Sequence, residues 1–239
     1  MTGHGAGNGH GGAGGGAPDG PYGGGADGPG LGPTLPEELL LLALDPVRGK
    51  PLNDASHLRY GLAGAALAEL ERTGRITEGR GGRILVGSPL PLGDLVLDTA
   101  LGTLPAAGTG ADVKVRRWVR SAARGIDEVC RQRLEQRGAI RRESRRALGV
   151  FRYERLAAGP ADLAGPARAR FKGALATGFA DPRDRVLAAL VSATHLDRKL
   201  ELGRDRRAVR RDLKALVREN WIARAVAAAV FQDEAAAGA

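Results

Sequence analysis

The chain has 239 residues, 37 of them glycine, and a formal net charge of +9 at pH 7. Its single cysteine, Cys130, excludes an internal disulfide and a cysteine-built metal site, and is typical of a reducing compartment. Two of the 27 acids, Asp19 and Asp27, lie in the first 33 residues, which hold no lysine or arginine. The rest therefore has 36 bases and 25 acids, a net charge of +11, which indicates an anionic partner: nucleic acid, membrane surface or acidic protein.

The first 33 residues contain sixteen glycines and too little apolar surface to offset the chain entropy of folding. We predict a disordered Gly-rich tail over residues 1–33. The segment lacks the basic start, apolar run and cleavage site of a secretory signal, so we expect a cytoplasmic protein. His4 and His10 have no thiol or carboxylate cluster beside them and are interpreted as part of a spacer.

A single folded domain is expected over residues 34–239. It opens with "TLPEELLLLALDP", in which a proline and two acids after Thr34 mark a helix start. The leucines that follow predict a helix buried nearly all round, because the run is too short to span a bilayer.

A second helix is predicted over "HLRYGLAGAALAELERTG", where apolar residues recur every three or four positions. Its Gly61 and Gly64 side would let another helix approach closely. A small β-hairpin is expected between Arg75 and Val86, and a third helix over residues 93–104.

The clearest helical period runs from Val115 to Leu134 and places Trp118 and Cys130 on a buried apolar face. Residues 139–156 indicate a second β-hairpin, and further helices are expected around residues 165–178, 181–202 and 205–232. The pattern predicts a mainly α fold: a single-domain helical bundle with two small β-hairpins.

We find no catalytic motif in the sequence and therefore expect no enzyme activity, no cofactor and no metal site. After residue 33 the only histidines are His57 and His195. We interpret each of them as a helix-surface or core histidine and not as a catalytic base.

Basic residues form two rows at helical spacing. The first lies on the long helix and comprises Arg117, Arg120, Arg124 and Arg131. The second lies on a later helix and comprises Arg207, Arg210, Arg211, Lys214 and Arg218. Either row alone is typical of a solvated face, but both together with the net charge favour a real anionic partner.

Six stretches in this order resemble the Golgi phosphoprotein 3 family, including its bacterial relatives. They read "TLPEELLLLALDPVRG", "LND", "GLAGAALAELERTGRI", "LGDLVLDTAL", "RLEQRGAI" and "DPRDRVLAALVSA". The resemblance implies a helical domain with an exposed β-hairpin that supports oligomerisation, here containing Val150, Phe151 and Tyr153. It also implies peripheral membrane binding through phosphatidylinositol 4-phosphate.

We compare the residues of the family's lipid pocket with this chain position by position. Leu52 stands where eukaryotic members have tryptophan, and Ala63 where they have arginine. On the long helix, Arg124 keeps one basic position of the pocket and Asp127 falls on the other. Loss of two cationic positions predicts a relaxed choice of head group.

We therefore expect a peripheral protein at the cytoplasmic face of a membrane that binds phosphoinositide or other anionic lipid. The residues expected to bind lipid are Arg124, Arg120, Arg117, Arg131 and Arg59. A nucleic-acid-binding protein is an alternative that the scarcity of stacking aromatics disfavours. A protein-binding adaptor without lipid affinity is the other.

Overall fold

The structure is a computed structural model that describes residues 1, 32–45, 50–106, 113–147, 151–203 and 205–238. It is 63% helical, which confirms the mainly α prediction. The helices are α1 (Leu35–Ala43), α2 (Ala55–Arg72), α3 (Leu95–Gly102), α4 (Val115–Gln136), α5 (Ala164–Ala176), α6 (Pro182–Ala193), the 3₁₀ helix η1 (Leu196–Arg198), α7 (Arg206–Glu219) and α8 (Trp221–Ala237).

Within the described part of the chain, five strands form two small antiparallel sheets. They are β1 (Ile76–Gly79), β2 (Arg83–Val86), β3 (Val113–Lys114), β4 (Ile140–Ala147) and β5 (Phe151–Ala158). The first expected hairpin is β1–β2, and β3 extends it by pairing Ile84 with Val113. None of the described helices combines the length and the apolar content needed to cross a membrane.

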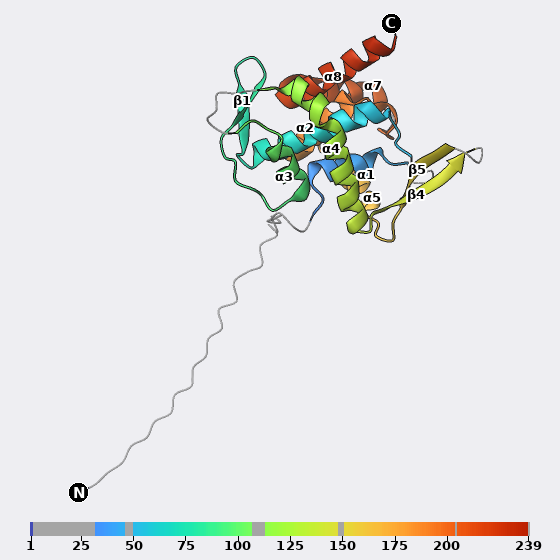
Figure 1. Cartoon of the computed structure of the whole chain (residues 1–239), viewed down its shortest axis with the longest axis horizontal. Helices are drawn as coiled ribbons and strands as arrows, with labels where there is room; N and C mark the ends of the chain where they lie inside the picture. Colours follow the sequence, from blue (N-terminus) through green and yellow to red (C-terminus); the bar gives the residue numbers. More distant parts are fainter. Residues whose placement is uncertain (2–31, 46–49, 107–112, 148–150, 204, 239) are drawn as a thin grey trace.

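Helix α2 lies at the centre of the bundle, in contact with α1, α3, α4, α6 and α8 (Figure 1). Its glycines allow the close approach that the sequence predicts. A Cβ atom at Gly64 would lie 2.5 Å from a methyl of Val226 on α8, and one at Gly61 would lie 2.6 Å from the methyl of Thr194. No side chain fits at these two positions without displacing a neighbour.

Helix α1 is buried along its whole length, its two acids included. The Glu37 carboxylate accepts hydrogen bonds from the backbone N–H and the hydroxyl of Thr34, at 2.7 and 3.1 Å, as in a capping box. The sequence reads these two acids as signals of a helix start and does not predict their burial. In the structure, the side chains of Glu37 and Glu38 are 0% exposed, so their charges require partners within the protein.

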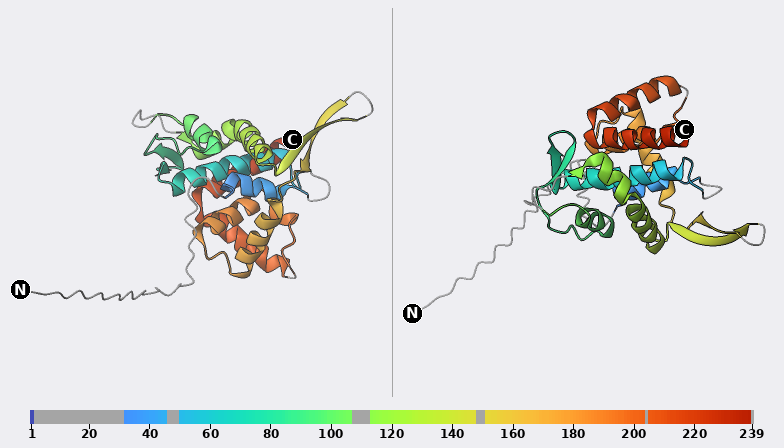
Figure 2. Two further views of the ribbon diagram at one scale, coloured as in Figure 1. Left: turned by 90° about the horizontal axis from the view of Figure 1, so that it is seen from below. Right: turned by 45° about the horizontal axis from the view of Figure 1, so that its top comes forward.

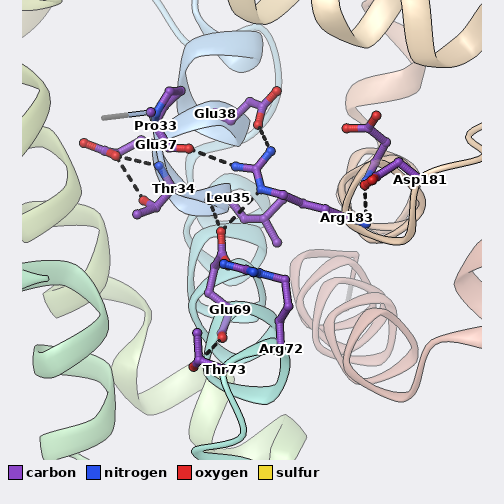
Figure 3. Close-up of polar contacts among 12 residues, drawn as sticks. Pro33, Thr34, Leu35, Glu37, Glu38, Glu69, Arg72, Thr73, Asp181 and Arg183 are labelled. Atoms are coloured by element: carbon purple, nitrogen blue, oxygen red, sulfur yellow. Dashed lines mark hydrogen bonds and ion pairs between the residues drawn. The ribbon is translucent and has the colours of Figure 1, made fainter. Parts of the chain in front are cut away.

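Those partners are arginines that lie far along the chain. Arg133 on α4 and Arg137, the residue that follows this helix, pair with Glu37 at 3.1 and 3.2 Å. Arg183 on α6 donates to Glu38 at 2.5 Å and lies 3.5 Å from Glu69 on α2 (Figure 3). We call these six residues the acid–arginine cluster. It fastens α1 to α2, α4 and α6.

The second predicted hairpin is β4–β5, which extends away from the helices in Figures 1 and 2. Its register runs from Ile140 opposite Ala158 to Ala147 opposite Phe151. Of the residues assigned to oligomerisation, Val150 lies outside the described residues, and only the backbone of Phe151 and Tyr153 is described.

The helix expected over residues 181–202 is shorter than the sequence predicts. It begins at Pro182, capped by Asp181, and ends at Ala193. His195 then adopts a left-handed backbone with φ of 60°, which breaks the helix before η1. This turn brings His195 towards the start of α2.

Candidate anion-binding site

Helix α4 presents arginines to solvent because its apolar stripe is fully used against the bundle. Trp118, Ile126 and Cys130 are buried, and the Trp118 indole donates a hydrogen bond to the Thr103 hydroxyl at 3.1 Å. Burial raises the pKa of the Cys130 thiol well above its ordinary value, so this cysteine stays protonated at neutral pH. The prediction that Trp118 and Cys130 lie in the core is confirmed.

An open pocket of about 430 Å³ lies where the first half of α2, the middle of α4 and the end of α8 meet. Three arginines, three hydroxyl-bearing side chains and one carboxylate contribute to its wall. The residues that line it are Ser56, Arg59, Tyr60, Arg120, Ser121, Ala123, Arg124 and Asp233. We call it the arginine pocket.

Tyr60 fixes one side of this pocket. Its hydroxyl donates to the Asp233 carboxylate at 3.1 Å, and the Arg120 guanidinium lies 6.0 Å from its ring centroid. Burial and the bond to Asp233 raise the pKa of Tyr60, so the phenol remains a donor. These contacts keep Arg120 at the pocket wall.

Asp127 is held away from solvent by two arginines. Its carboxylate accepts from Arg59 at 3.2 Å and from Arg131 at 2.6 Å, and its side chain is 8% exposed. Its negative charge is therefore compensated locally, which reduces the repulsion that the sequence suggests at this position.

The structure thus brings together three of the five arginines expected to bind lipid. Arg59, Arg120 and Arg124 line the arginine pocket. Arg131 pairs with Asp127, as Arg59 does, but it does not line the pocket. Arg117 is exposed on α4 and does not line it either.

The two other altered family positions do not line the pocket either. Ala63 is fully buried in α2, and Leu52 is half-buried against the core. Neither presents a polar group to a head group here.

The second basic row lines a separate open pocket of about 330 Å³ on α7, formed by Arg207, Arg210, Arg211, Lys214 and Arg218. Two of these cations have acidic neighbours: Arg210 lies 3.6 Å from Asp197 and Arg211 lies 3.4 Å from Asp212. The second basic row therefore forms one surface on α7, and nearby acids compensate part of its positive charge.

Sequence reasoning missed one grouping altogether. The rings of His57 and His195 lie 5.7 Å apart, nearly perpendicular, beside the carboxylates of Asp54, Asp233 and Glu234. The two histidines are far apart in sequence, so no local spacing could reveal them.

The fold and the pocket define a mainly α-helical protein with a projecting hairpin and an arginine-lined surface pocket. The model of the Golgi phosphoprotein 3 (GPP34) family matches residues 35–232, and the chain belongs to this family. A search of curated proteins finds no match.

Proposed function

We propose that the protein binds anionic lipid head groups at a membrane surface through the arginine pocket, with phosphoinositides as the preferred class. The observation that carries the proposal is the convergence of Arg59, Arg120 and Arg124 from two helices on one open pocket. Its volume falls within the range typical of small-ligand sites.

The chemistry of the wall suits a phosphorylated ring. Guanidinium groups bind phosphate oxygens with two parallel hydrogen bonds, and the hydroxyls of Ser56 and Ser121 can donate to or accept from a sugar-like ring. Asp233, also in the wall, is engaged by the Tyr60 hydroxyl and is placed to accept from a ring hydroxyl.

Family membership supports the same class of ligand, because the Golgi phosphoprotein 3 resemblance implies binding of phosphatidylinositol 4-phosphate. Leu52 and Ala63 replace two of the family's pocket residues without lining the pocket in this chain. We infer that the head group is chosen mainly by charge, with weaker discrimination among phosphoinositides.

The expected affinity of one site is low. About 1 kcal/mol per cation near an anionic leaflet gives at most about 3 kcal/mol for three arginines, because Arg59 also compensates the charge of Asp127. Stable residence therefore requires several sites in one assembly, which agrees with an oligomer formed through the β4–β5 hairpin. On this proposal the protein is a peripheral adaptor on the cytoplasmic face, with a binding role and no catalytic one.

The experiment is co-sedimentation of the full chain with liposomes of neutral lipid, acidic lipid, or acidic lipid with phosphatidylinositol 4-phosphate. We expect the wild type to sediment with both acidic sets, most strongly with the third. Arg124→Glu reverses a pocket charge and should reduce the bound fraction several-fold.

Arg218→Glu is the matched control, because it makes the same charge change at an exposed helical arginine on α7. Equal loss in both variants would show that binding follows net charge and not the arginine pocket. A wild type that stays in the supernatant at low salt would refute the proposal.

A further inference from the structure

Five metal-ligating side chains from three elements meet beside the arginine pocket. Asp54 and His57 come from the start of α2, His195 from the turn before η1, and Asp233 and Glu234 from the end of α8. Ligand atoms of His57, His195 and Glu234 all lie within 4.8 Å of one another, and the same holds for Asp54, His57 and Asp233. Both groups share the His57 imidazole.

The backbone that carries His195 is fastened to α2. The Asn53 amide donates to the Thr194 carbonyl at 3.1 Å, and the Thr194 methyl packs over Gly61, where no Cβ would fit. These contacts hold the left-handed turn in place. A non-glycine residue with positive φ costs conformational energy and persists where surrounding structure enforces it.

The groups are chemically ready to bind a cation. His195 Nδ1 lies 3.1 Å from a Glu234 oxygen, and no hydrogen bond engages the His57 ring among the described residues. A neutral imidazole keeps a lone pair on one ring nitrogen, which can bind a metal ion. His195 is 28% exposed and Glu234 44% exposed, which leaves a path for an ion.

We propose that His57, His195 and Glu234 form a binding site for a divalent transition-metal ion of the zinc class. Two imidazoles with a carboxylate suit this class, whereas magnesium and calcium prefer sites made of oxygen alone. Tetrahedral zinc with bonds of about 2.1 Å requires ligand atoms about 3.4 Å apart, so small side-chain rotations close the site.

The two carboxylates of the other group, those of Asp54 and Asp233, can support the proposed metal site. A metal-bound histidine commonly donates its other ring N–H to a carboxylate, which fixes the ring orientation. Asp54 and Asp233 lie within reach of His57 for this role, and a water or one of these carboxylates completes the coordination. The proposal replaces the expectation of no metal, and it goes beyond lipid binding, since it requires no lipid.

The test is equilibrium dialysis of the tag-free, chelator-treated full chain against zinc alone, with metal content read by mass spectrometry. We expect saturable binding of one equivalent that excess magnesium does not displace. Cobalt in place of zinc should give the visible absorption of a low-coordinate nitrogen–oxygen site. Thermal unfolding should shift upwards with zinc.

Two variants address the ligands separately. His57→Gln and His195→Asn should each weaken zinc binding at least tenfold and remove the thermal shift. Asparagine tolerates the left-handed backbone, so His195→Asn keeps the turn even if His57→Gln perturbs folding. Circular dichroism of the metal-free variants should match the wild type.

Two controls separate this site from other binding. Glu201→Gln alters an exposed carboxylate outside the cluster, and His4→Gln with His10→Gln removes the histidines of the first 33 residues. Both should bind zinc as the wild type does. Absence of saturable binding, or binding that only the His4 and His10 changes abolish, would overturn the proposal.

Discussion

Arg183 ties three parts of the chain together through one side chain. It donates to the Pro33 carbonyl at 2.8 Å and pairs with Glu38 and Glu69. Burial alone would lower the pKa of the guanidinium, but Glu38, Glu69 and Asp184 together outweigh burial and raise it. The charged state is therefore retained inside the protein.

Removal of this guanidinium should be costly. We expect Arg183→Ala to lower the free energy of unfolding by about 3–5 kcal/mol, because the buried Glu38 charge would be left with the more distant Arg170, at 3.8 Å, while Glu69 keeps Arg72. Denaturant unfolding measures the effect. Arg185→Ala, on the same helix, removes an exposed pair with Glu219 and should cost at most about 1 kcal/mol. Equal losses would contradict a special role for the buried pair.

Single residues also show where sequence reasoning stops. The burial of Trp118 and Cys130 follows from helical periodicity, which is a local property. The partners of Glu37 and Glu38 do not, since Arg133 and Arg183 are distant in sequence and the tertiary fold alone selects them from 36 bases. Asp127 shows both cases: Arg131 lies four residues further along the same helix, a local spacing, whereas Arg59 on α2 is distant in sequence.

At the scale of elements, two glycines in helices should respond oppositely to alanine. Gly64 contacts α8, and a Cβ there would lie 2.5 Å from Val226, whereas a Cβ at Gly125 on α4 meets no heavy atom within 4 Å. We expect Gly64→Ala to destabilise by about 1–3 kcal/mol through overpacking. Gly125→Ala should stabilise by up to about 1 kcal/mol through helix propensity. Thermal unfolding of both variants checks the signs, and a stabilised Gly64→Ala would contradict the close packing.

The β4–β5 hairpin can be shortened without touching the helices. Residues 143–155 would be replaced by an Asn-Gly turn between Arg142 and Leu156, which face each other across the strands. If the hairpin mediates oligomerisation, light scattering should show a lower mass. Binding to acidic liposomes should also weaken about 100-fold as avidity is lost. Unchanged mass with intact circular dichroism would assign oligomerisation elsewhere.

Element boundaries were largely predictable, because caps and periods are local. Asp54, Asp94 and Asp181 each accept hydrogen bonds from the first turn of the helix that follows. The exception is the early end of α6 at Ala193. Nothing in the local pattern distinguishes the left-handed His195 from another helical residue, and contacts with α2 fix it.

For the whole molecule, the net charge permits both membranes and nucleic acid as partners. We expect the full chain to bind anionic liposomes more tightly than duplex DNA at physiological salt, with both affinities falling as salt rises. A nucleic-acid-binding protein would instead show the tighter affinity for DNA, with a slope of log affinity against log salt near −0.9 per phosphate contacted. Titrations of both partners over the same salt series decide between them.

The acid–arginine cluster also orders events during synthesis on the ribosome. The acids of α1 emerge first, but the arginines that pair with them, among them Arg133 on α4 and Arg183 on α6, are made much later. Glu69 on α2 differs, because Arg72 of the same helix pairs with it at 2.8 Å. Until Arg183 leaves the exit tunnel, the Glu38 carboxylate is better hydrated than buried, so we expect α1 to stay undocked. We therefore expect the leucine-rich first helix to be among the last to dock onto the bundle. Until it docks, its apolar surface is accessible to chaperones on the nascent chain.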